Sequence, residues 1–445
     1  MKKGWIRALA LLLLAFMTTA GASAKDIQLT FMFWGSPAED HAIRKALKDF
    51  EAANPGIKVK PLYAVYSGAE YDAKMKAMSQ SGTLPDVGYF GGNFYEYASS
   101  DFFLDMTPYV QQDNLESQYL PQTWIRYHDK IYGAFTAAEC QVMYYNKDVL
   151  KAAGVTPPPT DPQHAWTWDQ YVAAWQKLTV DRKGKHPNEP GFDKKHVVRF
   201  GVQHEVWDQM LFPTIWGNGG SIFSPDGKQI LIDSPETTEA IQRLADLRNK
   251  YFVMAAPGLT EYNSTAKTDP KVLMESRQLA FYVSGQWELL DFAGMHFPLG
   301  IGALPVQQHP AQVYVSGVNV IFKQTKNPDA AWKLQKWMMT PGKTLDLYKK
   351  GLWMPTKSSW YTDHADLAKW VDNKAHPAGF KEAVLGSMSY AKVFPMNVKN
   401  YGQMWSEFIN PELDLIWQGK ESAADGLKKA ADNVRKSGLL VGLWD

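Results

Sequence analysis

Residues 27–37 read IQLTFMFWGSP, and this stretch indicates the fold class of the chain. Ile27–Phe33 is a mostly apolar run of strand length. Ser36 and Glu39 have the spacing of a helical capping box, with Pro37 at the first helical position. An apolar stripe at helical spacing follows. We therefore expect a buried strand that turns directly into an amphipathic helix.

The alternation of strands and helices continues along the chain. The first helix should end at Asn54-Pro55-Gly56, before a second strand over Ile57–Leu62. A second helix around Ala73–Met78 precedes a third strand that Pro85-Asp86-Val87 introduces. Further elements follow in the same way, at Val142–Tyr145, Lys147–Gly154, Thr167–Leu178 and after Ser422. This order is typical of α/β layers.

Length and composition limit the class of protein. At about 100–200 residues per domain, a chain of 445 residues suggests two or three domains. A hydrophobic content of 45% excludes a disordered or collagen-like chain. Because 47 basic residues face 46 acidic ones, no net field attracts nucleic acid or an anionic membrane. The single cysteine, Cys140, excludes an internal disulfide, and without an evident base partner we expect it to be a buried filler.

Residues 1–24 have the features of a secretory signal peptide. Three cations precede the apolar run Ala8–Met17, and Ala22-Ser23-Ala24 is an A-x-A cleavage site. The apolar run is too short for a membrane-spanning helix, which needs about 20 residues. No cysteine lies near the cleavage site, so we expect a periplasmic protein without a lipid anchor. Removal of the three cations leaves 44 of the 47 basic residues against 46 acidic ones.

The motifs of common enzyme classes are incomplete in this sequence. Gly342-Lys343-Thr344 lacks the earlier glycine of a phosphate-binding loop, and no G-x-S-x-G is present. His204-Glu205-Val206-Trp207-Asp208 begins like H-E-x-x-H, but Asp208 replaces the second histidine. We expect His204 to be a hydrogen-bonding group rather than a metal ligand. Glycoside hydrolysis stays open, because it needs only two placed carboxylates.

Aromatic and uncharged polar residues follow several of the expected strands. Trp34 comes after the first strand, Asn93 after the third, and Trp287 after Ser284-Gly285-Gln286. Ligands of α/β sheets bind beyond the carboxyl ends of the strands. An indole ring packs against the apolar face of a sugar, and Asn, Asp and Glu bind its hydroxyls. Most of the 17 tryptophans should be core residues, with Trp34 and Trp287 the best candidates for a ligand site.

Several segments, taken in order, resemble a known family. The most specific is ECQVMYYNKD at residues 139–148, which Ala152-Ala153-Gly154 and Thr167-Trp168-Asp169 follow. Supporting segments are NPGIKV at 54–59, GTLPDV at 82–87, GQW at 285–287, NPDAAW at 327–332 and GLWMP at 351–355. Over nearly the whole mature sequence, the chain is similar to the extracellular solute-binding proteins of carbohydrate ABC importers, the family that contains maltose-binding protein.

The resemblance implies a periplasmic-binding-protein fold, also called a Venus flytrap. Two discontinuous α/β lobes, joined by a hinge, would close on a sugar between them. The chain would cross between the lobes near Phe135–Ala138, Ile301–Pro305 and Met338–Pro341. Lobe 1 would comprise residues 25–137 and 303–341, and lobe 2 residues 138–302 and 342–445.

The resemblance also implies a set of sugar contacts. Glu139 matches a sugar-binding carboxylate, and Asn93 stands where the family has a binding aspartate. Glu205 and Trp207 resemble a Glu-x-aromatic contact pair, and Trp287 resembles a stacking tryptophan. Two further positions, Trp353 as a second stacking platform and Trp34 in the loop after the first strand, complete the set: Trp34, Asn93, Glu139, Glu205, Trp207, Trp287 and Trp353.

The implied function is reversible capture of a sugar or oligosaccharide for a membrane ABC permease, by a monomer without metal, cofactor or catalysis. Two alternatives stay open. A secreted glycoside hydrolase would place Glu139 and Glu205 about 5–9.5 Å apart across a glycosidic bond. The same fold could instead bind a polyamine, a polyol phosphate or an acidic sugar. Arg126, Arg199 and Arg277 are the candidates to contact an anionic ligand.

Overall fold

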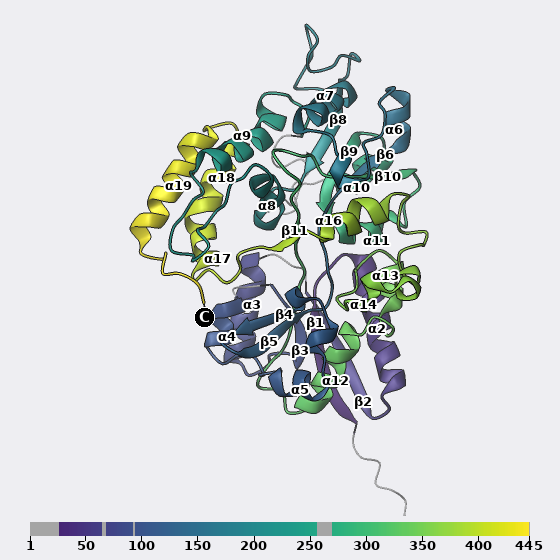
Figure 1. Ribbon diagram of the computed structural model, residues 1–445, viewed down its shortest axis with the longest axis vertical. Helices are drawn as coiled ribbons and strands as arrows, with labels where there is room; N and C mark the ends of the chain where they lie inside the picture. The colour runs from purple at the N-terminus through teal and green to yellow at the C-terminus, as the bar shows by residue number, and fades with distance from the viewer. Residues whose placement is uncertain (1–25, 65–67, 92–93, 256–268, 445) are drawn as a thin grey trace, which may run out of the picture.

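The computed structural model describes residues 26–64, 68–91, 94–255 and 269–444. The expected signal peptide and Asn93 lie outside the described residues. The chain forms two α/β lobes, each built on its own sheet, with connecting segments between them (Figure 1). The expected division into two α/β lobes is confirmed.

The first lobe contains a six-stranded sheet of mixed direction. Strand β1 runs parallel to both β2 and β3, whereas β12 pairs antiparallel with β3 and with β5. The order across the sheet is β2 (Ile57–Tyr63), β1 (Ile27–Phe33), β3 (Val87–Phe90), β12 (Val318–Ile321), β5 (Lys130–Phe135) and β4 (Trp124–Tyr127). Because β12 comes from a distant part of the chain, this lobe is discontinuous in sequence, as expected.

The second lobe contains a five-stranded sheet. Strands β8 and β9 run parallel, and β6 pairs antiparallel with both β9 and β10. The order across the sheet is β10 (Leu299–Gly302), β6 (Gln141–Asn146), β9 (Leu279–Gly285), β8 (Val197–His204) and β7 (Val180–Asp181).

Helices surround both sheets (Figure 1). Those of the first lobe are α2 (Pro37–Ala53), α3 (Gly68–Gln80), α4 (Phe94–Ser99), α5 (Thr107–Gln112) and α12 (Pro328–Met339). Those of the second lobe before residue 300 are α6 (Lys147–Ala152), α7 (Trp168–Leu178), α8 (Asp208–Gly217), α9 (Pro235–Asn249), α10 (Pro270–Glu275) and α11 (Leu289–Phe292). The C-terminal third adds α13 (Leu345–Lys349), α14 (Ser359–Thr362), α15 (His364–Ala368), α16 (Gly386–Met388), α17 (Tyr401–Met404), α18 (Asn410–Trp417) and α19 (Ala423–Ser437). Short 3₁₀ or π turns are η1 (Glu116–Gln118), η2 (Pro121–Thr123), η3 (Pro162–His164), η4 (Gln286–Glu288), η5 (Lys381–Leu385) and η6 (Trp405–Ile409).

Local sequence signals explain where several helices begin. The Ser36 hydroxyl accepts a hydrogen bond from the Glu39 backbone N–H at 3.2 Å, with Pro37 in the first turn of α2. Thr167 and Gln170 form a complete capping box at the start of α7. Ser422 caps α19. These helix starts agree with the sequence-based predictions.

The segments that connect the two sheets lie side by side. Residues between Phe135 of β5 and Gln141 of β6 lead into the second sheet, and residues 303–317 lead back to β12. Glu139 and Val315 of these two segments form an antiparallel bridge. A third segment joins them, because β13 (Lys392–Val393) pairs with β11 (Val313–Tyr314).

Two hydrophobic cores divide the C-terminal third of the chain. Buried residues from Leu347 to Val384 share a core with the first sheet and with one face of the second sheet, whereas those from Val398 to Val434 share a core with the rest of the second lobe. The lobe boundaries expected from the sequence, including a crossing at 338–341, stay a prediction. Within the described ranges, no helix is both long and apolar enough to cross a membrane.

Candidate ligand-binding site

An aromatic group lies at the carboxyl ends of β1 and β3 in the first lobe. Trp34 follows β1, and its indole contacts Tyr71 and Tyr89 edge-on at centroid distances of 5.2 and 5.0 Å. Trp353 approaches Tyr89 from a distant part of the chain, with centroids 6.4 Å apart, and is only 3% exposed. Trp34 keeps part of its surface open, so it is the member of this group that can stack on a ligand directly.

Glu39 adds a carboxyl group beside this aromatic group. The Tyr89 hydroxyl lies 3.5 Å from Glu39 Oε1, where it can donate a hydrogen bond. Gly35 makes room for this carboxyl, because a Cβ at residue 35 would lie 2.0 Å from Glu39 Oε2. Burial, with a smaller contribution from the nearby carboxylate of Asp291, raises the pKa of Glu39 to about 8. Glu39 is therefore largely protonated at neutral pH.

Glu139 lies in the connecting segment between the sheets and is 8% exposed. Its backbone N–H donates to the Val315 carbonyl at 3.1 Å, which fixes the residue between the lobes. Burial raises the pKa of the Glu139 carboxyl well above its usual value, the charge of Glu39 adds to this effect, and a hydrogen bond with Ser316 opposes it. On this side of the site, the carboxyl group of Glu39 therefore disfavours ionisation of Glu139.

A pair of tryptophans forms the second lobe's part of the site. Trp207 follows β8, Trp287 follows β9, and their ring centroids lie 6.4 Å apart with the planes tilted by 37°. Gly285 permits this position of Trp287, because a Cβ at residue 285 would lie 2.1 Å from the indole. Both tryptophans remain partly exposed, and Trp287 packs against both hydrophobic cores.

Two buried carboxylates lie beneath this pair. The Tyr282 hydroxyl donates to Glu205 Oε1 at 2.9 Å and lies 3.4 Å from Glu288 Oε1. The Ser284 hydroxyl donates to Glu288 Oε1 at 3.1 Å. Glu205 and Glu288 are 5% and 6% exposed, so these hydroxyls replace water as their donors.

Lys271 supplies the positive charge on this side. Its Nζ lies 2.5 Å from Glu288 Oε2 and 3.3 Å from carboxylate oxygens of both Asp269 and Asp291. Burial alone would lower the pKa of Lys271, but the three carboxylates outweigh burial and raise it. Burial raises the pKa of Glu288, and Lys271 offsets part of that rise. The lysine is therefore charged and fixed by its partners.

A direct contact joins the two lobes at the site. The Ser36 hydroxyl, at the start of α2, donates to Asp291 Oδ1 of α11 at 2.9 Å. Asp291 also contacts Lys271 and influences Glu39, so the polar groups of both lobes form one continuous network. The structure thus brings Trp34, Glu139, Glu205, Trp207 and Trp287 to the sheet ends where the lobes meet.

The other side chains that the sequence singled out have different environments. His204 is buried, its Nδ1 lies 2.6 Å from the Glu205 carbonyl oxygen, and burial lowers its pKa to about 4. Cys140 is fully buried, and burial raises the pKa of its thiol. The arginines bind elsewhere: Arg126 pairs with Glu116, Arg199 Nε donates to the Leu178 carbonyl, and Arg277 pairs with Asp148.

The sequence analysis missed several members of this network. Glu39 was assigned only to helix capping, although its position just after Trp34-Gly35-Ser36 also signals the end of a strand. Glu288 follows Trp287 directly and could have been found in the same way. Tyr89, Tyr282 and Lys271 carry no local signal, because their polar groups meet the site only through tertiary contacts.

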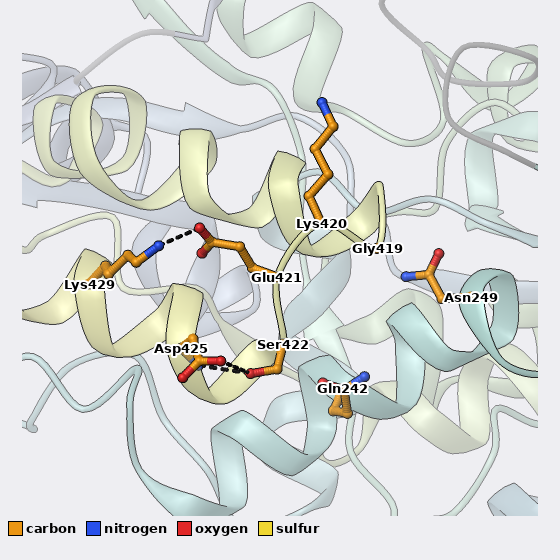
Figure 2. A pocket seen from close by; sticks show the side chains of 8 residues that line it. All are labelled: Gln242, Asn249, Gly419, Lys420, Glu421, Ser422, Asp425 and Lys429. Carbon is orange, nitrogen blue, oxygen red and sulfur yellow. Dashed lines mark hydrogen bonds and ion pairs between the residues drawn. The ribbon is translucent and has the colours of Figure 1, made fainter.

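Surface hollows lie elsewhere. Figure 2 shows one of about 610 Å³ between α9 and the turn from α18 to α19. Its charged and polar side chains bind one another, as Lys429 does with Glu421 and Ser422 with Asp425. A second hollow of about 270 Å³ lies between α2 and residues 342–350. Neither shares a residue with the network at the lobe junction, so neither marks the site.

Two discontinuous α/β lobes, with aromatic and carboxyl groups converging where they meet, define a two-lobed solute-binding protein. The sequence profile described as "Bacterial extracellular solute-binding protein" matches residues 45–378. The chain therefore belongs to this family, and the family assignment made from the sequence is confirmed.

Relatives and solved structures agree with this assignment. The chain is 22% identical over 441 residues to a galactooligosaccharide-binding protein of Bacillus subtilis, covering 94% of this chain and 91% of the relative. It is 27% identical over 271 residues to an arabinooligosaccharide-binding protein of the same organism, covering 58% and 57%. An ABC substrate-binding protein of Listeria monocytogenes, solved with cycloalternan, has the same fold, with a TM-score of 0.79, 24% identity and coverage of 93% and 99%. A solute-binding protein of Thermotoga lettingae, solved with tagatose, gives a TM-score of 0.74, 22% identity and coverage of 93% and 100%.

Proposed function

We propose that this protein reversibly binds a sugar or oligosaccharide between its lobes and delivers it to a membrane ABC permease. The observation that carries this proposal is that partly exposed tryptophans and buried carboxyl groups occur on both sides of the lobe junction: Trp34 and Glu139 on one side, and Trp207, Trp287 and Glu205 on the other. The names of relatives support the same ligand class, since they bind arabino- and galactooligosaccharides.

Each site residue has a role that follows from its chemistry. Trp34, Trp207 and Trp287 offer ring faces to the apolar side of a sugar. Glu139 and Glu205 bind sugar hydroxyls, and Glu139 does so from the hinge. Trp353 is buried against Tyr89 and would contact a ligand only after the lobes part. Asn93 keeps its proposed role as a hydroxyl partner, although it lies outside the described residues.

Binding would drive closure through contacts that exist only when both lobes touch the ligand. An open form presents half of the site on each lobe, and the sugar stabilises the closed form by its additional contacts there. No bond is broken in this cycle, so we propose a binding protein rather than an enzyme. The environment of Glu205 fits this role, because Tyr282 already donates to its Oε1.

The charged surroundings favour a sugar without acidic groups. Arg126, Arg199 and Arg277 contact groups away from the lobe junction, so none of them is placed to bind an anionic ligand there. Burial raises the pKa of Glu39 and of Glu139, so these groups disfavour a negative charge, and neither of them supplies the cation that a phosphate or a uronic acid would need. A neutral sugar needs no such cation, and its hydroxyls can form hydrogen bonds with the same carboxyl groups.

The proposed cellular setting follows from the family, which is extracellular. We propose that residues 1–24 are removed on export and that the mature protein works in the periplasm as a monomer without a lipid anchor. We also propose the lobe division at residues 25–137 with 303–341 and 138–302 with 342–445.

The direct test is to identify the natural ligand. Purified protein is denatured, and mass spectrometry identifies any released small molecule, for which we expect a sugar. If none is released, a thermal-shift panel of sugars follows, since a ligand at a hundred times its Kd adds about 2.7 kcal/mol of stability. A thermal shift with an amine, a phosphate or a metal, and none with any sugar, would contradict the proposal. Turnover of a bound oligosaccharide would instead favour the hydrolase.

Trp287→Ala tests the site within the same assay. Loss of the stacking ring should weaken binding of the identified sugar by about 1–3 kcal/mol, measured by titration calorimetry. Trp166→Ala is the matched control, because Trp166 is also half-buried but packs against Tyr171 beside α7. Equal affinity of the two variants would contradict the placement of the sugar at Trp287.

A further inference from the structure

The C-terminal tail, residues 438–444, runs back along residues 397–400 after α19 ends. The Asn400 side chain donates to the Leu439 carbonyl at 2.9 Å, and the Lys399 backbone N–H donates to the Gly442 carbonyl at 3.0 Å. Leu443 forms a bridge with Val398, and the Trp444 backbone N–H donates to the Asn397 carbonyl at 2.8 Å. Three hydrogen bonds therefore fix the path of this short tail, and the two backbone bonds among them make the Val398–Leu443 bridge.

These links attach the tail to the second lobe. Val398 is buried in the core of that lobe, and Leu443 packs against the same core. The contact is close, because a Cβ added at Gly227 would lie 2.7 Å from a Leu443 methyl carbon. The preceding helix α19 also packs on α9 and α18 of this lobe.

Trp444 points the opposite way and packs against the first lobe. Its ring stacks on Tyr95 of α4, with centroids 6.5 Å apart and planes 8° from parallel, and meets Tyr127 of β4 edge-on at 5.8 Å. The Lys399 ammonium lies 5.2 Å from the centroid of the same ring. Successive side chains of an extended chain point to opposite sides, which explains how Leu443 and Trp444 can contact different lobes. In Figure 1 the C-terminus lies beside α4 of the first lobe, at the end of the yellow segment.

The residues that the tail contacts are connected to the candidate ligand-binding site on both lobes. In the first lobe, Tyr95 lies in the first turn of α4, the next helix in the chain after β3. In the second lobe, Asn400 binds the tail, and the hydroxyl of the neighbouring Tyr401 donates to Asp208 Oδ2 at 3.0 Å; Asp208 follows Trp207 of the site. The tail is therefore linked to the site indirectly on each side.

We propose that the C-terminal tail is a latch, in which Trp444 seated on Tyr95 and Tyr127 favours the closed arrangement of the lobes. The inference rests on the proposed function for its biological purpose, since the latch would set how readily the site opens for a sugar. Parting of the lobes must either remove Trp444 from its two tyrosines or detach the tail from residues 397–400. Both routes lose contacts that the closed arrangement keeps, so the latch stabilises closure before any ligand is present.

Small-angle X-ray scattering of the ligand-free protein tests the latch without knowledge of the sugar. Trp444→Ala should increase the radius of gyration and raise the ratio of open to closed molecules roughly fivefold to tenfold, as expected for the loss of two aromatic contacts. Val441→Ala is the matched control, because Val441 belongs to the same tail but is 54% exposed, and it should leave the scattering unchanged.

Tyr127→Ala removes one first-lobe partner of Trp444 from the same contact. It should shift the scattering in the same direction as Trp444→Ala, and the double variant should shift it less than the sum of the two. Trp444→Phe should restore most of the closed form, because it keeps a ring between the two tyrosines. Circular dichroism checks folding, and if Trp444→Ala does not fold, Trp444→Phe and Tyr127→Ala carry the test.

Two results would overturn the latch: scattering of Trp444→Ala that matches the wild type, or shifts of Trp444→Ala and Tyr127→Ala that simply add. Because none of these measurements uses a ligand, they are independent of the proposed sugar. A protein that bound no sugar could still show the latch, and a sugar-binding protein could lack it.

Discussion

The two halves of the candidate site differ in how their buried carboxyl groups are stabilised. In the second lobe, Lys271 lies within 2.5 Å of Glu288, and Tyr282 donates to Glu205. On the other side of the site, among the described residues, no lysine or arginine forms an ion pair with Glu39 of the first lobe or with Glu139 of the connecting segment. Burial raises the pKa of both carboxyl groups, and together with neighbouring carboxylates it brings that of Glu39 to about 8.

This difference implies that the second-lobe side of the site is formed before a ligand binds, whereas the side of Glu39 and Glu139 is completed by the ligand. A buried charge that is paired within the protein needs nothing from a ligand. A buried carboxyl without a cation gains most from hydroxyl donors that arrive later. We infer that the second-lobe face is the rigid half of the site, and that the carboxyl groups of Glu39 and Glu139 are stabilised mainly by a bound sugar.

The largest expected effect comes from breaking the preformed face. Lys271→Met keeps the bulk of a side chain that is only 12% exposed but leaves Glu288 buried without its cation. Removal of one partner from a buried pair should lower the free energy of unfolding by about 3–5 kcal/mol, measured by urea denaturation.

Lys323→Met is the control for this variant. Lys323 pairs with Asp101 on the surface, where its side chain is 53% exposed, so its loss should change stability by less than about 1 kcal/mol. Equal effects of the two variants would show that the second-lobe face is not held by its lysine.

A smaller effect should distinguish the tyrosines of the two faces. Tyr282→Phe removes a hydroxyl 2.9 Å from Glu205, and we expect it to cost about 1–2 kcal/mol of stability. Tyr89→Phe removes a longer contact of 3.5 Å to Glu39 and should cost less than about 0.5 kcal/mol. Chemical denaturation of both variants in one buffer measures the two losses of stability. A larger loss for Tyr89→Phe would contradict the expectation that the second-lobe face is the more tightly hydrogen-bonded one.

The last expected effect depends on pH and concerns Glu39. Its pKa is about 8 in the folded protein against 4.5 for the unperturbed group, so between these values the folded state holds a proton that the unfolded state has lost. Stability should therefore fall as the pH rises from 4.5 towards 8.

Glu39→Gln should remove this slope. At pH 8 the variant should be more stable than the wild type by about 1 kcal/mol, a modest value because Glu39 keeps some contact with solvent. At pH 4.5 the two proteins should have the same stability. Thermal unfolding across this range measures the difference, and parallel curves for the two proteins would contradict a buried, protonated Glu39.

The sequence predicted the local elements of the fold well, because their signals are local. Ile27–Phe33 is a strand with the expected bounds, and Ser36 and Thr167 cap the helices that follow them. The pairing of β12 between β3 and β5 has no local signal, since its partners lie far away in sequence. Only the resemblance to a family indicated that the lobes are discontinuous.

The site was predictable to the extent that its residues follow strands. Trp34 and Trp287 stand after β1 and β9, a position that the sequence pattern indicates, whereas Trp207, close behind β8, was indicated only by the family resemblance. The network beneath them was not predictable in this way. Lys271 meets Glu288 across 17 residues, and Ser36 meets Asp291 across 255, so only the folded chain brings these charges together.

The place of β12 also constrains the order in which the molecule can assemble. Until residues 318–321 are available, the first sheet consists of two separate parts, β2-β1-β3 and β5-β4, with the gap in the middle rather than at an edge. The whole second sheet is synthesised before that strand. Pairing over such long sequence separations slows folding. A newly made chain should therefore stay incompletely folded for most of its synthesis, a state in which it can still be threaded through a membrane channel.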